Sequence, residues 1–324
     1  MDRQLALELA RVTELAAIAS GRFMGKGDKI AADGAAVKAM RAMFDTVDID
    51  GTVVIGEGEM DEAPMLYIGE QVGSGKGAKV DIAVDPLEGT NLVAKGQPNA
   101  IAVLAVAPKG CLLHAPDMYM EKICVGPAGK GKIDIDATVK ENLTALSIAK
   151  NCRISDLTVV ILDRPRHHDI IQQVREAGAR CKLITDGDVA PAVAAALDNT
   201  GVDMLIGTGG APEGVLAAAA LKCLGGDMQA RLVPHTEAER QRCQEMGLEN
   251  AEDILMLDDL VKGDDVIFAS TGITDGESLT GVRYFGGGAH TQTLVMRSKT
   301  GTIRFISATH FLDKKPLIKD FFQW

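Results

Sequence analysis

The amino-acid sequence predicts an α/β protein with two lobes, and three observations lead to this fold class. The chain has 324 residues, a length at which one hydrophobic core usually gives way to two. In its first half, short β-branched runs follow two helical patterns and leave no room for crossover helices, whereas its second half repeats strand, polar turn and helix. We expect a mixed or antiparallel sheet in an α+β lobe over 1–150 and a parallel sheet in an α/β lobe over 151–324.

Two helices are predicted at the start of the first lobe. Apolar residues recur at spacings of three and four over 2–20 and 33–45, and Asp2 and Asp33 stand where an N-cap is expected. Short β-branched runs between Gly-rich turns then predict strands. These runs occupy residues 52–55, 79–84 and 100–107.

The second lobe contains three strand-turn-helix units. Right-handed crossovers between parallel strands place all three polar turns at the carboxyl ends of their strands, where open α/β sheets bind ligands. The strands are predicted at 157–162, 182–185 and 203–206. Residues 235–262 predict peripheral helices, and 282–309 predict further strands whose lobe the pattern leaves open.

Composition excludes several classes of protein. With 46% hydrophobic and 24% charged residues the chain is a globular one, and its formal net charge of −11 would repel a phosphate backbone, so no nucleic-acid partner is expected. Six cysteines without a C-x-x-C pair disfavour a zinc ribbon or a disulfide framework. The acidic N-terminus and the lack of a run of about 18 apolar residues predict no signal peptide and no membrane span. A cytoplasmic location is expected.

The segment Val80–Thr90 carries the strongest local signal. A buried strand ends at Pro86, which lacks an N–H donor, and this ending directs Asp85 and Glu88 off the strand. Gly89 lets the backbone approach a ligand, and carboxylate oxygens are preferred by Mg²⁺ and Mn²⁺. The alternative is a strand end with a solvated acidic turn.

Two further glycine-rich segments contain acids. In the segment 56–62, Glu57 lies between two glycines at a strand end, and a metal would offset the repulsion among its acids; an acidic surface loop is the alternative. In the segment 207–214, a glycine loop meets a helix that begins near Pro212, which favours an anion such as phosphate. Glu213 is a candidate metal ligand there or a carboxylate that stabilises the helix dipole.

Basic residues supply candidate phosphate contacts. Arg164 and Arg166 stand at the first polar turn of the second lobe, where two guanidinium groups would suit a phosphate other than the metal-bound one; surface arginines are the alternative. The adjacent His167 and His168 are expected to cap or decorate the helix rather than bind metal. Lys29 is a candidate counter-charge for a phosphate or a solvated loop lysine.

Competing motifs fail on detail. Residues 73–78 match G-x-G-x-x-A, but a strand rather than a helix follows them, which disfavours a dinucleotide site. The sequence contains no Walker A loop, no histidine pair with metal-binding spacing and no nucleophile elbow.

The segment 85–90, with Glu57 upstream and the Gly-Gly-x-x-Glu of 209–213 downstream, resembles the lithium-sensitive, metal-dependent phosphatase superfamily. Glu88 departs from the Asp of most members, and together with 56–59 and 207–214 it is similar to the bacterial class II fructose-1,6-bisphosphatases. The resemblance runs over nearly the whole chain and implies a layered α-β-α-β-α fold.

The resemblance also implies the residues of a site. Metal ligands would be Asp33, Glu57, Asp85, Glu88 and Glu213. Contacts to a sugar phosphate would come from Glu88, Gly89, Thr90, Tyr119, Arg164, Pro165, Arg166, Asp186, Gly187, Asp188 and Gly210. Thr90 would orient a water, Lys29 would add a counter-charge, and Asp61 is a candidate proton acceptor.

The implied activity is hydrolysis of the C1 phosphate of fructose 1,6-bisphosphate in gluconeogenesis. Two or more Mn²⁺ or Mg²⁺ ions would serve each site of a homodimer or homotetramer, since metal ions can activate water and stabilise the leaving oxygen. Three alternatives remain at this point: an inositol-phosphate or other sugar monophosphate phosphatase, a sedoheptulose-1,7-bisphosphatase, and a sugar-phosphate sensor without activity.

Overall fold

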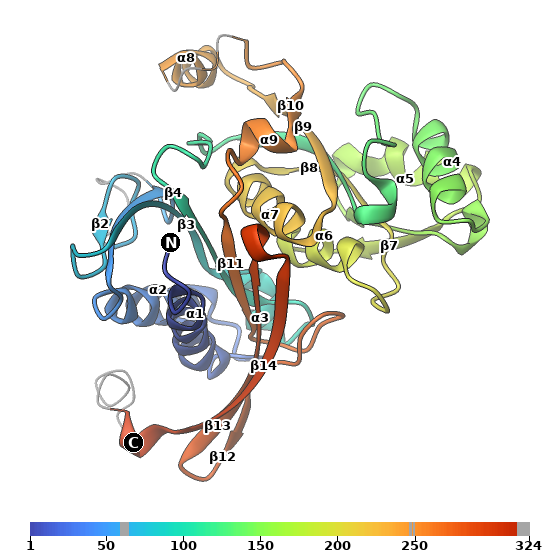
Figure 1. Ribbon diagram of the computed structural model, residues 1–324. Helices are drawn as coiled ribbons and strands as arrows, with labels where there is room; N and C mark the ends of the chain where they lie inside the picture. Colours follow the sequence, from blue (N-terminus) through green and yellow to red (C-terminus); the bar gives the residue numbers. More distant parts are fainter. Residues whose placement is uncertain (59–64, 246–247, 249, 316–324) are drawn as a thin grey trace. The chain divides into compact units, whose positions relative to one another are not determined.

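The computed structural model describes residues 1–58, 65–245, 248 and 250–315, and it divides the chain into two compact units. The first unit comprises Met1–Leu112 and the segment that starts at Asp264, and the second comprises Leu113–Gly263. Each unit is built on its own β-sheet (Figure 1). This division differs from the boundary expected at residue 150, because the strand over Tyr119–Val125 pairs within the second sheet and the late strands pair within the first.

The first unit contains an eight-stranded mixed sheet with strand order β12-β13-β11-β4-β3-β1-β2, and β14 pairs with β13. β1 and β3 are parallel. The pairs of β3 with β4, β4 with β11, β11 with β13, and β13 with β14 are antiparallel. The mixed sheet predicted for this lobe is therefore confirmed. The elements are α1 (Leu5–Gly21), α2 (Lys29–Phe44), β1 (Ile49–Ile55), β2 (Gln71–Val72), β3 (Ala78–Glu88), α3 (Thr90–Lys95), β4 (Ile101–Pro108), β11 (Ile267–Gly272), β12 (Arg283–Phe285), β13 (Gly288–Arg297) and β14 (Thr302–Phe311).

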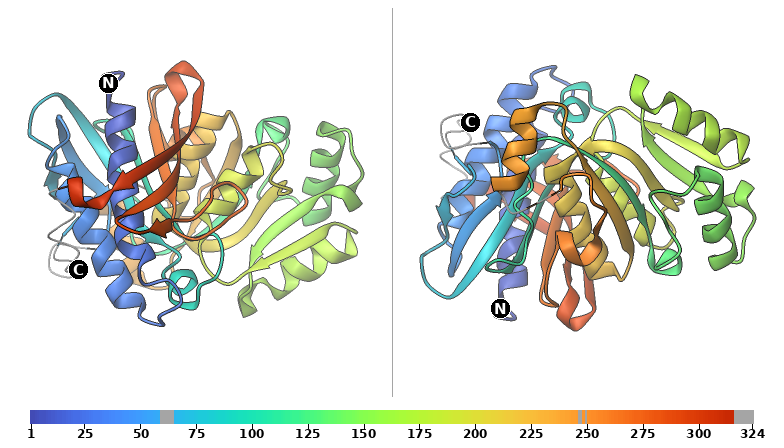
Figure 2. Two further views of the ribbon diagram at one scale, coloured as in Figure 1. Left: turned by 90° about the horizontal axis from the view of Figure 1, so that it is seen from below. Right: turned by 90° about the horizontal axis from the view of Figure 1, so that it is seen from above.

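The helices α1 and α2 pack against each other, and α1 runs along the sheet of the first unit (Figure 2). The two N-caps expected from the sequence are wrong. Asp28 caps α2, since its Oδ1 accepts a hydrogen bond from the Ala31 amide at 2.9 Å, and Asp33 lies inside the helix. At the start of α1, Asp2 Oδ1 accepts from the Gln4 amide at 2.8 Å, so Asp2 lies outside the helix. Because Asp28 already satisfies the helix start, capping does not occupy the Asp33 carboxylate.

The second unit contains a six-stranded sheet with strand order β10-β9-β5-β8-β6-β7. β6 is parallel to β7 and to β8, as predicted, but β5 runs antiparallel between β8 and β9, so the sheet is mixed rather than parallel throughout. The elements are β5 (Tyr119–Val125), α4 (Val139–Ala149), β6 (Thr158–Leu162), α5 (His168–Glu176), β7 (Arg180–Ile184), α6 (Val189–Ala196), β8 (Met204–Gly210), α7 (Ala211–Leu224), β9 (Asp227–Val233), α8 (Glu237–Glu245), β10 (Leu255–Met256) and α9 (Leu257–Leu260).

Alternation along β5 divides its side chains between the two faces of this sheet. Ile123 and Val125 belong to a core that also holds buried residues of α4, α5 and β6. Because successive strand residues point to opposite faces, Lys122 and Cys124 point to the other face, where α6 and α7 pack against β5. A charged side chain is thereby buried on the face that carries the ends of α6 and α7.

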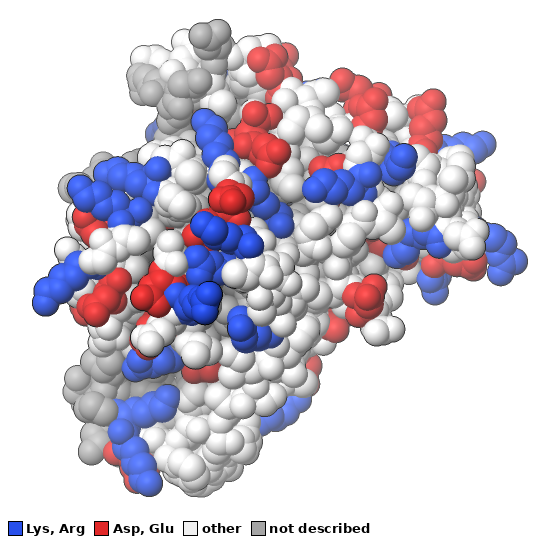
Figure 3. All heavy atoms as spheres, viewed as in Figure 1, with Lys and Arg blue, Asp and Glu red and all other residues white. Residues whose placement is uncertain are grey.

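No helix among the described residues is both long and apolar enough to cross a membrane. Basic and acidic side chains intermingle over the face of the protein drawn in Figure 3.

A buried ion pair ties the N-terminus to the sheet of the first unit. Arg297 on β13 donates from Nε and Nη2 to the two carboxylate oxygens of Asp265, at 2.7 and 2.8 Å. The α-amino group of Met1 lies 3.2 Å from Asp265 Oδ2, and Arg297 Nη2 also donates to the Met1 carbonyl at 2.8 Å. Both side chains are about nine-tenths buried, and the Arg297 guanidinium holds the pKa of Asp265 below its ordinary value of 3.8.

The substitution Asp265→Asn should lower the free energy of unfolding at pH 7 by roughly 3 kcal/mol, because it leaves the buried Arg297 without its carboxylate. A lowered carboxyl pKa stabilises the fold above the unfolded pKa, so the wild-type advantage should disappear as the pH falls below about 4. Urea unfolding of both proteins at several pH values measures this difference. The exposed pair of Arg11 and Glu8 provides a control, since Glu8→Gln should cost less than about 1 kcal/mol. Equal costs for the two substitutions would contradict the prediction.

Candidate active site

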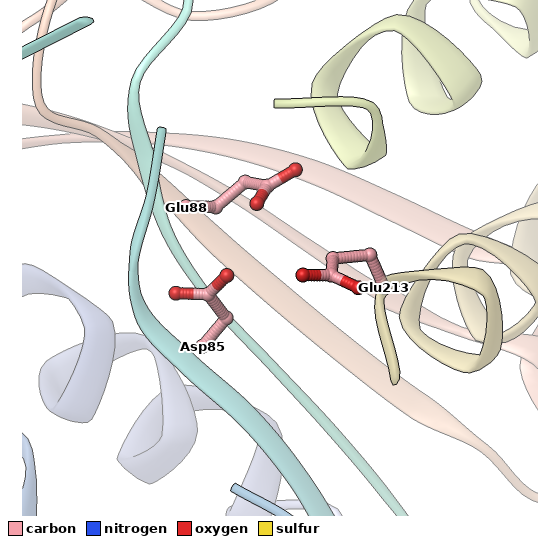
Figure 4. Close-up of side chains that lie close together, drawn as sticks. All are labelled: Asp85, Glu88 and Glu213. Carbon is pink, nitrogen blue, oxygen red and sulfur yellow. The ribbon is translucent and has the colours of Figure 1, made fainter. Parts of the chain in front are cut away.

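A β-bulge places two carboxylates on the same side of β3. Asp85 pairs with Val103 of β4, but Glu88 pairs with Ile101, so three steps on β3 oppose two steps on β4. Residues three apart on a regular strand point to opposite faces, and the extra residue reverses this relation. Carboxylate oxygens of Asp85 and Glu88 consequently lie within 4.8 Å of each other (Figure 4). Pro86 suits this position, because a residue without an N–H loses no ladder bond in a bulge.

The chain turns from β3 into α3 through a single glycine. Gly89 has a φ of +89°, in the left-handed region, and a Cβ on this residue would lie 2.8 Å from Leu92 Cδ1. Thr90 is therefore the first residue of α3, directly after Glu88 and Gly89. Lys29 is exposed at the first position of α2, one turn before Asp33. Asp61, the predicted proton acceptor, lies outside the described residues.

Asp33 and Glu57 form a second pair of acids in the first unit. Burial, together with the negative charge of Asp33, raises the pKa of Glu57 to about 8, and burial also raises the pKa of Asp33. Glu57 is fixed by its backbone, since its amide donates to the Leu66 carbonyl at 3.0 Å and Gly58 follows with a φ of +135°. The repulsion between the two acids is what a bound divalent cation would relieve.

In the second unit, Glu213 folds back against the start of α7. Gly210 is the N-cap residue of α7, and a Cβ there would lie only 1.8 Å from Glu213 Oε2, so the position requires glycine. The Glu213 side chain is drawn in Figure 4. Glu213 Oε2 is buried and accepts no hydrogen bond from the described part of the chain. Burial raises the pKa of this carboxyl, Asp188 raises it further, and Lys122 opposes them. A buried acceptor without a donor is costly, and a divalent cation would satisfy it, so Glu213 fits a metal ligand.

Lys122 is the positive charge at this face of the second sheet. Its side chain is 1% exposed, and its Nζ lies 2.7 Å from Asp188 Oδ2 and 2.9 Å from the Gly210 carbonyl oxygen, to which it donates. A Cβ on Gly209 would lie 2.1 Å from Asp188 Oδ2, so a glycine at 209 makes room for the ion pair. Lys122 thus holds a predicted sugar contact and the N-cap of the helix that carries Glu213.

Two arginines are held by backbone carbonyls at the carboxyl ends of β7 and β8, the two strands that flank β6. Arg166 donates from Nε and Nη2 to the Thr208 carbonyl at 3.1 and 2.7 Å, and Arg164 donates from Nη2 to the Thr185 carbonyl at 2.7 Å. The Arg166 guanidinium carbon also lies 4.7 Å from the ring centroid of Tyr119, a cation–π distance. Between the arginines, Pro165 starts a short 3₁₀ turn. Two of the five N–H donors of Arg166 are thereby used, and the contacts fix the direction of the others.

The remaining predicted sugar contacts of the second unit lie at the same edge of the sheet. Tyr119, at the start of the antiparallel β5, pairs with Gly210 at the end of β8. Asp186 and Gly187 follow β7, Gly187 has a φ of +71°, and Asp188 is the N-cap residue of α6. The expectation that the polar turns meet at one edge agrees with the parallel pairing of β6 with β7 and β8.

Sequence reasoning missed two residues of this region, Lys122 and Thr208, and gave His167 only a local role. Lys122 lies in the run Met120–Val125 of β5. The apolar residues around it would have marked this lysine as buried, but no strand was predicted there, so the signal was not used. Thr208 acts through its backbone, so its side-chain type carries no signal.

The two mixed sheets with their helices define a class: layered α/β proteins of the sugar-phosphatase type, here with an acidic cluster that could hold a metal ion. A sequence model of the family described as bacterial fructose-1,6-bisphosphatase, glpX-encoded, matches residues 3–310, and the chain belongs to this family. The resemblance seen in the sequence motifs is therefore confirmed.

Similar curated proteins agree with the family. The chain is 51% identical over 328 aligned residues to fructose-1,6-bisphosphatase 1 class 2 of Escherichia coli K12, with 97% of each chain covered. Class 2 fructose-1,6-bisphosphatases of Escherichia coli O6:H1 and of Shigella flexneri have the same identity and coverage.

The substitution Lys122→Met should destabilise the second unit by roughly 3 to 5 kcal/mol, since Asp188 would stay buried without its counter-charge. Denaturant unfolding measures the loss. Adding Asp188→Asn should recover part of the stability, because both charges are then removed. Lys150→Met is the matched control: Lys150 pairs with Asp203 at the surface of the same unit, and its loss should cost less than about 1 kcal/mol. A double variant no more stable than Lys122→Met would contradict this role.

Proposed function

We propose that the protein hydrolyses the C1 phosphate of fructose 1,6-bisphosphate, giving fructose 6-phosphate and inorganic phosphate. The observation that carries the proposal is the bulged end of β3, which turns two carboxylates to one side directly before Gly89 and Thr90. The names of the relatives, fructose-1,6-bisphosphatases of class 2 at 51% identity, support the substrate. The protein is thus a phosphoric monoester hydrolase.

Among the proposed metal ligands, Asp33, Glu57 and Glu213 have carboxyl pKa values raised by burial, and Asp85, Glu88 and Glu213 form an acidic cluster. Buried acids that repel one another, and a buried carboxylate oxygen with no donor among the described residues, suit a hard divalent cation such as Mn²⁺ or Mg²⁺. When bound, two or more such ions would supply an activated water and charge stabilisation for the leaving oxygen. The ligand set is Asp33, Glu57, Asp85, Glu88 and Glu213.

Three residues of the first unit are proposed to act on the reacting phosphate. Thr90, fixed at the start of α3 by the glycine turn before it, would orient the attacking water through its hydroxyl. Lys29, exposed one turn before Asp33, would neutralise phosphate charge. Asp61 is proposed as the group that accepts the proton of the water. Positioning and charge neutralisation dominate phosphoryl transfer, so no covalent intermediate is needed.

The second unit is proposed to bind the sugar and its other phosphate. Arg164 and Arg166 carry forks of N–H donors that match a phosphate, and the fixed carbonyls behind them limit their motion. Sugar hydroxyls would be bound by Tyr119 and by the Asp186–Asp188 turn. Backbone contacts to the sugar phosphate are proposed for Pro165, Gly187 and Gly210 of this unit, and for Gly89 of the first unit.

The setting of this activity is also a proposal. Membership in the family suggests a cytoplasmic enzyme of gluconeogenesis that works as a homodimer or homotetramer. The described residues contain no disulfide, as suits a reducing compartment.

Release of inorganic phosphate tests the proposal directly. The purified protein should release phosphate from fructose 1,6-bisphosphate with Mn²⁺ or Mg²⁺ present, and removal of the metal by chelation should stop it. Inositol monophosphate should give no comparable rate, because it offers no second phosphate to the arginines. Asp85→Asn should lower kcat at least about 100-fold while the protein stays folded, since it removes a metal ligand. An active Asp85→Asn enzyme, or activity after chelation, would refute the metal-dependent mechanism.

Arg166→Ala tests the distal phosphate contact separately. KM for fructose 1,6-bisphosphate should rise by roughly 10- to 100-fold with a smaller change in kcat, because a charge-assisted fork to the non-reacting phosphate is lost. Steady-state kinetics measure the split. Arg175→Ala, on the neighbouring α5, serves as the control and should leave both constants unchanged. Unchanged KM in Arg166→Ala would remove Arg166 from the site.

A further inference from the structure

His167 is a buried imidazole with both ring nitrogens engaged by backbone groups. It ends the 3₁₀ turn Pro165–His167 and is 1% exposed. Its Nδ1 lies 2.7 Å from the carbonyl oxygen of Leu162, and its Nε2 accepts a hydrogen bond from the Thr208 amide at 2.8 Å. A carbonyl can only accept and an amide can only donate, so the ring is neutral and carries its proton on Nδ1.

This imidazole replaces hydrogen bonds that the sheet lacks. β6 and β8 are paired only at Val159 with Met204 and at Val160 with Leu205. Beyond that point the two strands are joined by His167, which bridges the end of β6 to Thr208. The close fit requires a glycine, since Gly207 has a φ of +140° and a Cβ there would lie 3.0 Å from His167 Nε2.

The bridge ends on the residue that orients Arg166. His167 binds the N–H of Thr208, and the C=O of the same residue accepts two hydrogen bonds from Arg166, at 3.1 and 2.7 Å. A shift of Thr208 therefore moves the carbonyl on which the guanidinium rests. Misplacing a substrate contact by about 1 Å is enough to weaken binding strongly.

We propose that His167 is a positioning residue for the distal phosphate site, acting through Thr208 on Arg166. The inference rests on the proposed function, since it deepens the role given there to Arg166. His167 does not touch the substrate. It holds the Thr208 backbone so that the remaining N–H donors of Arg166 point to where a phosphate is bound.

Two substitutions separate the two hydrogen bonds of the ring. The amide oxygen of Gln reaches the place of Nε2 and can accept from Thr208, whereas the amide of Asn reaches only the place of Nδ1 and can donate to Leu162. His167→Gln should keep the KM for fructose 1,6-bisphosphate near the wild-type value. His167→Asn should raise it roughly tenfold with little change in kcat.

A substrate without a second phosphate, fructose 1-phosphate, distinguishes the positioning of Arg166 from a general effect on stability. With fructose 1-phosphate, which has nothing for Arg166 to bind, all variants should have the wild-type kcat/KM. His168→Gln is the matched control, because this neighbouring histidine is exposed at the start of α5 and should affect neither substrate. Thermal unfolding of each variant accompanies the kinetics.

The outcomes are distinct. A wild-type protein that releases no phosphate from fructose 1,6-bisphosphate refutes the proposed function, independently of the variants. If the wild type is active but His167→Asn loses kcat/KM equally on both substrates, His167 is a structural residue and the inference is overturned. The same conclusion follows if the His167→Asn protein does not fold. A larger KM in His167→Gln than in His167→Asn also overturns it, because Leu162 rather than Thr208 would then be the effective partner.

Discussion

Burial of carboxylates, with added repulsion from neighbouring acids at Glu57 and Glu213, is a constraint that acts in both units of the protein. In the second unit a lysine of the chain itself supplies the counter-charge. Lys122 lies 2.7 Å from Asp188, and its positive charge opposes the rise that Asp188 causes in the pKa of Glu213. In the first unit the pKa values of Asp33 and Glu57 are raised, and no basic residue of the described chain opposes these shifts. Two neighbouring acids without a local cation are a state that folding alone disfavours. A divalent cation bound near Asp33 and Glu57 would lower these raised pKa values, which fits the metal-dependent family to which the chain belongs.

The backbone, rather than the side-chain types alone, makes these acids converge. Asp85 and Glu88 would point to opposite faces of a regular strand, and only the bulge between them turns both to one side. Glu213 folds back because the residue before α7 is a glycine, since a side chain at 210 would occupy the position of its carboxylate. The direction in which each of these carboxylates points is thus set by the bulge or the glycine beside it in the chain. Replacing such a proline or glycine would alter the site without touching a ligand.

The parts of the fold that the sequence predicts are those that local chemistry determines. The polar turns after β6 and β7 depend on neighbouring residues, and these predictions agree with the structure. The strand end expected at Pro86 is wrong, because the bulge carries β3 through the proline to Glu88. The turn expected at 207–210 is also wrong, because β8 runs to Gly210 and α7 begins at Ala211. Asp28 and Asp33 are equally good cap residues by type, so the start of α2 was decided by packing and was predicted five residues late at Asp33.

Long-range pairing determines the rest. β5 lies between β8 and β9, about 80 to 115 residues later in the chain, and nothing in its local pattern specifies that position. The role of Lys122 follows from this placement, and that of Thr208 follows from the position of β8 beside β6, whose turn carries Arg166 and His167. Neither pairing is specified by the local sequence.

The sheet of the second unit also sets how the two arginines spread. Arg164 and Arg166 leave one turn at the end of β6, which lies between β7 and β8. Arg164 rests on the carbonyl of Thr185, just after β7, and Arg166 rests on the carbonyl of Thr208 in β8, so the two side chains diverge to opposite sides of β6. Neighbouring strands are about 4.8 Å apart, so the two anchoring carbonyls are held by strands roughly 10 Å apart. The spacing of the guanidinium groups is therefore set by strand pairing, which is far stiffer than a loop.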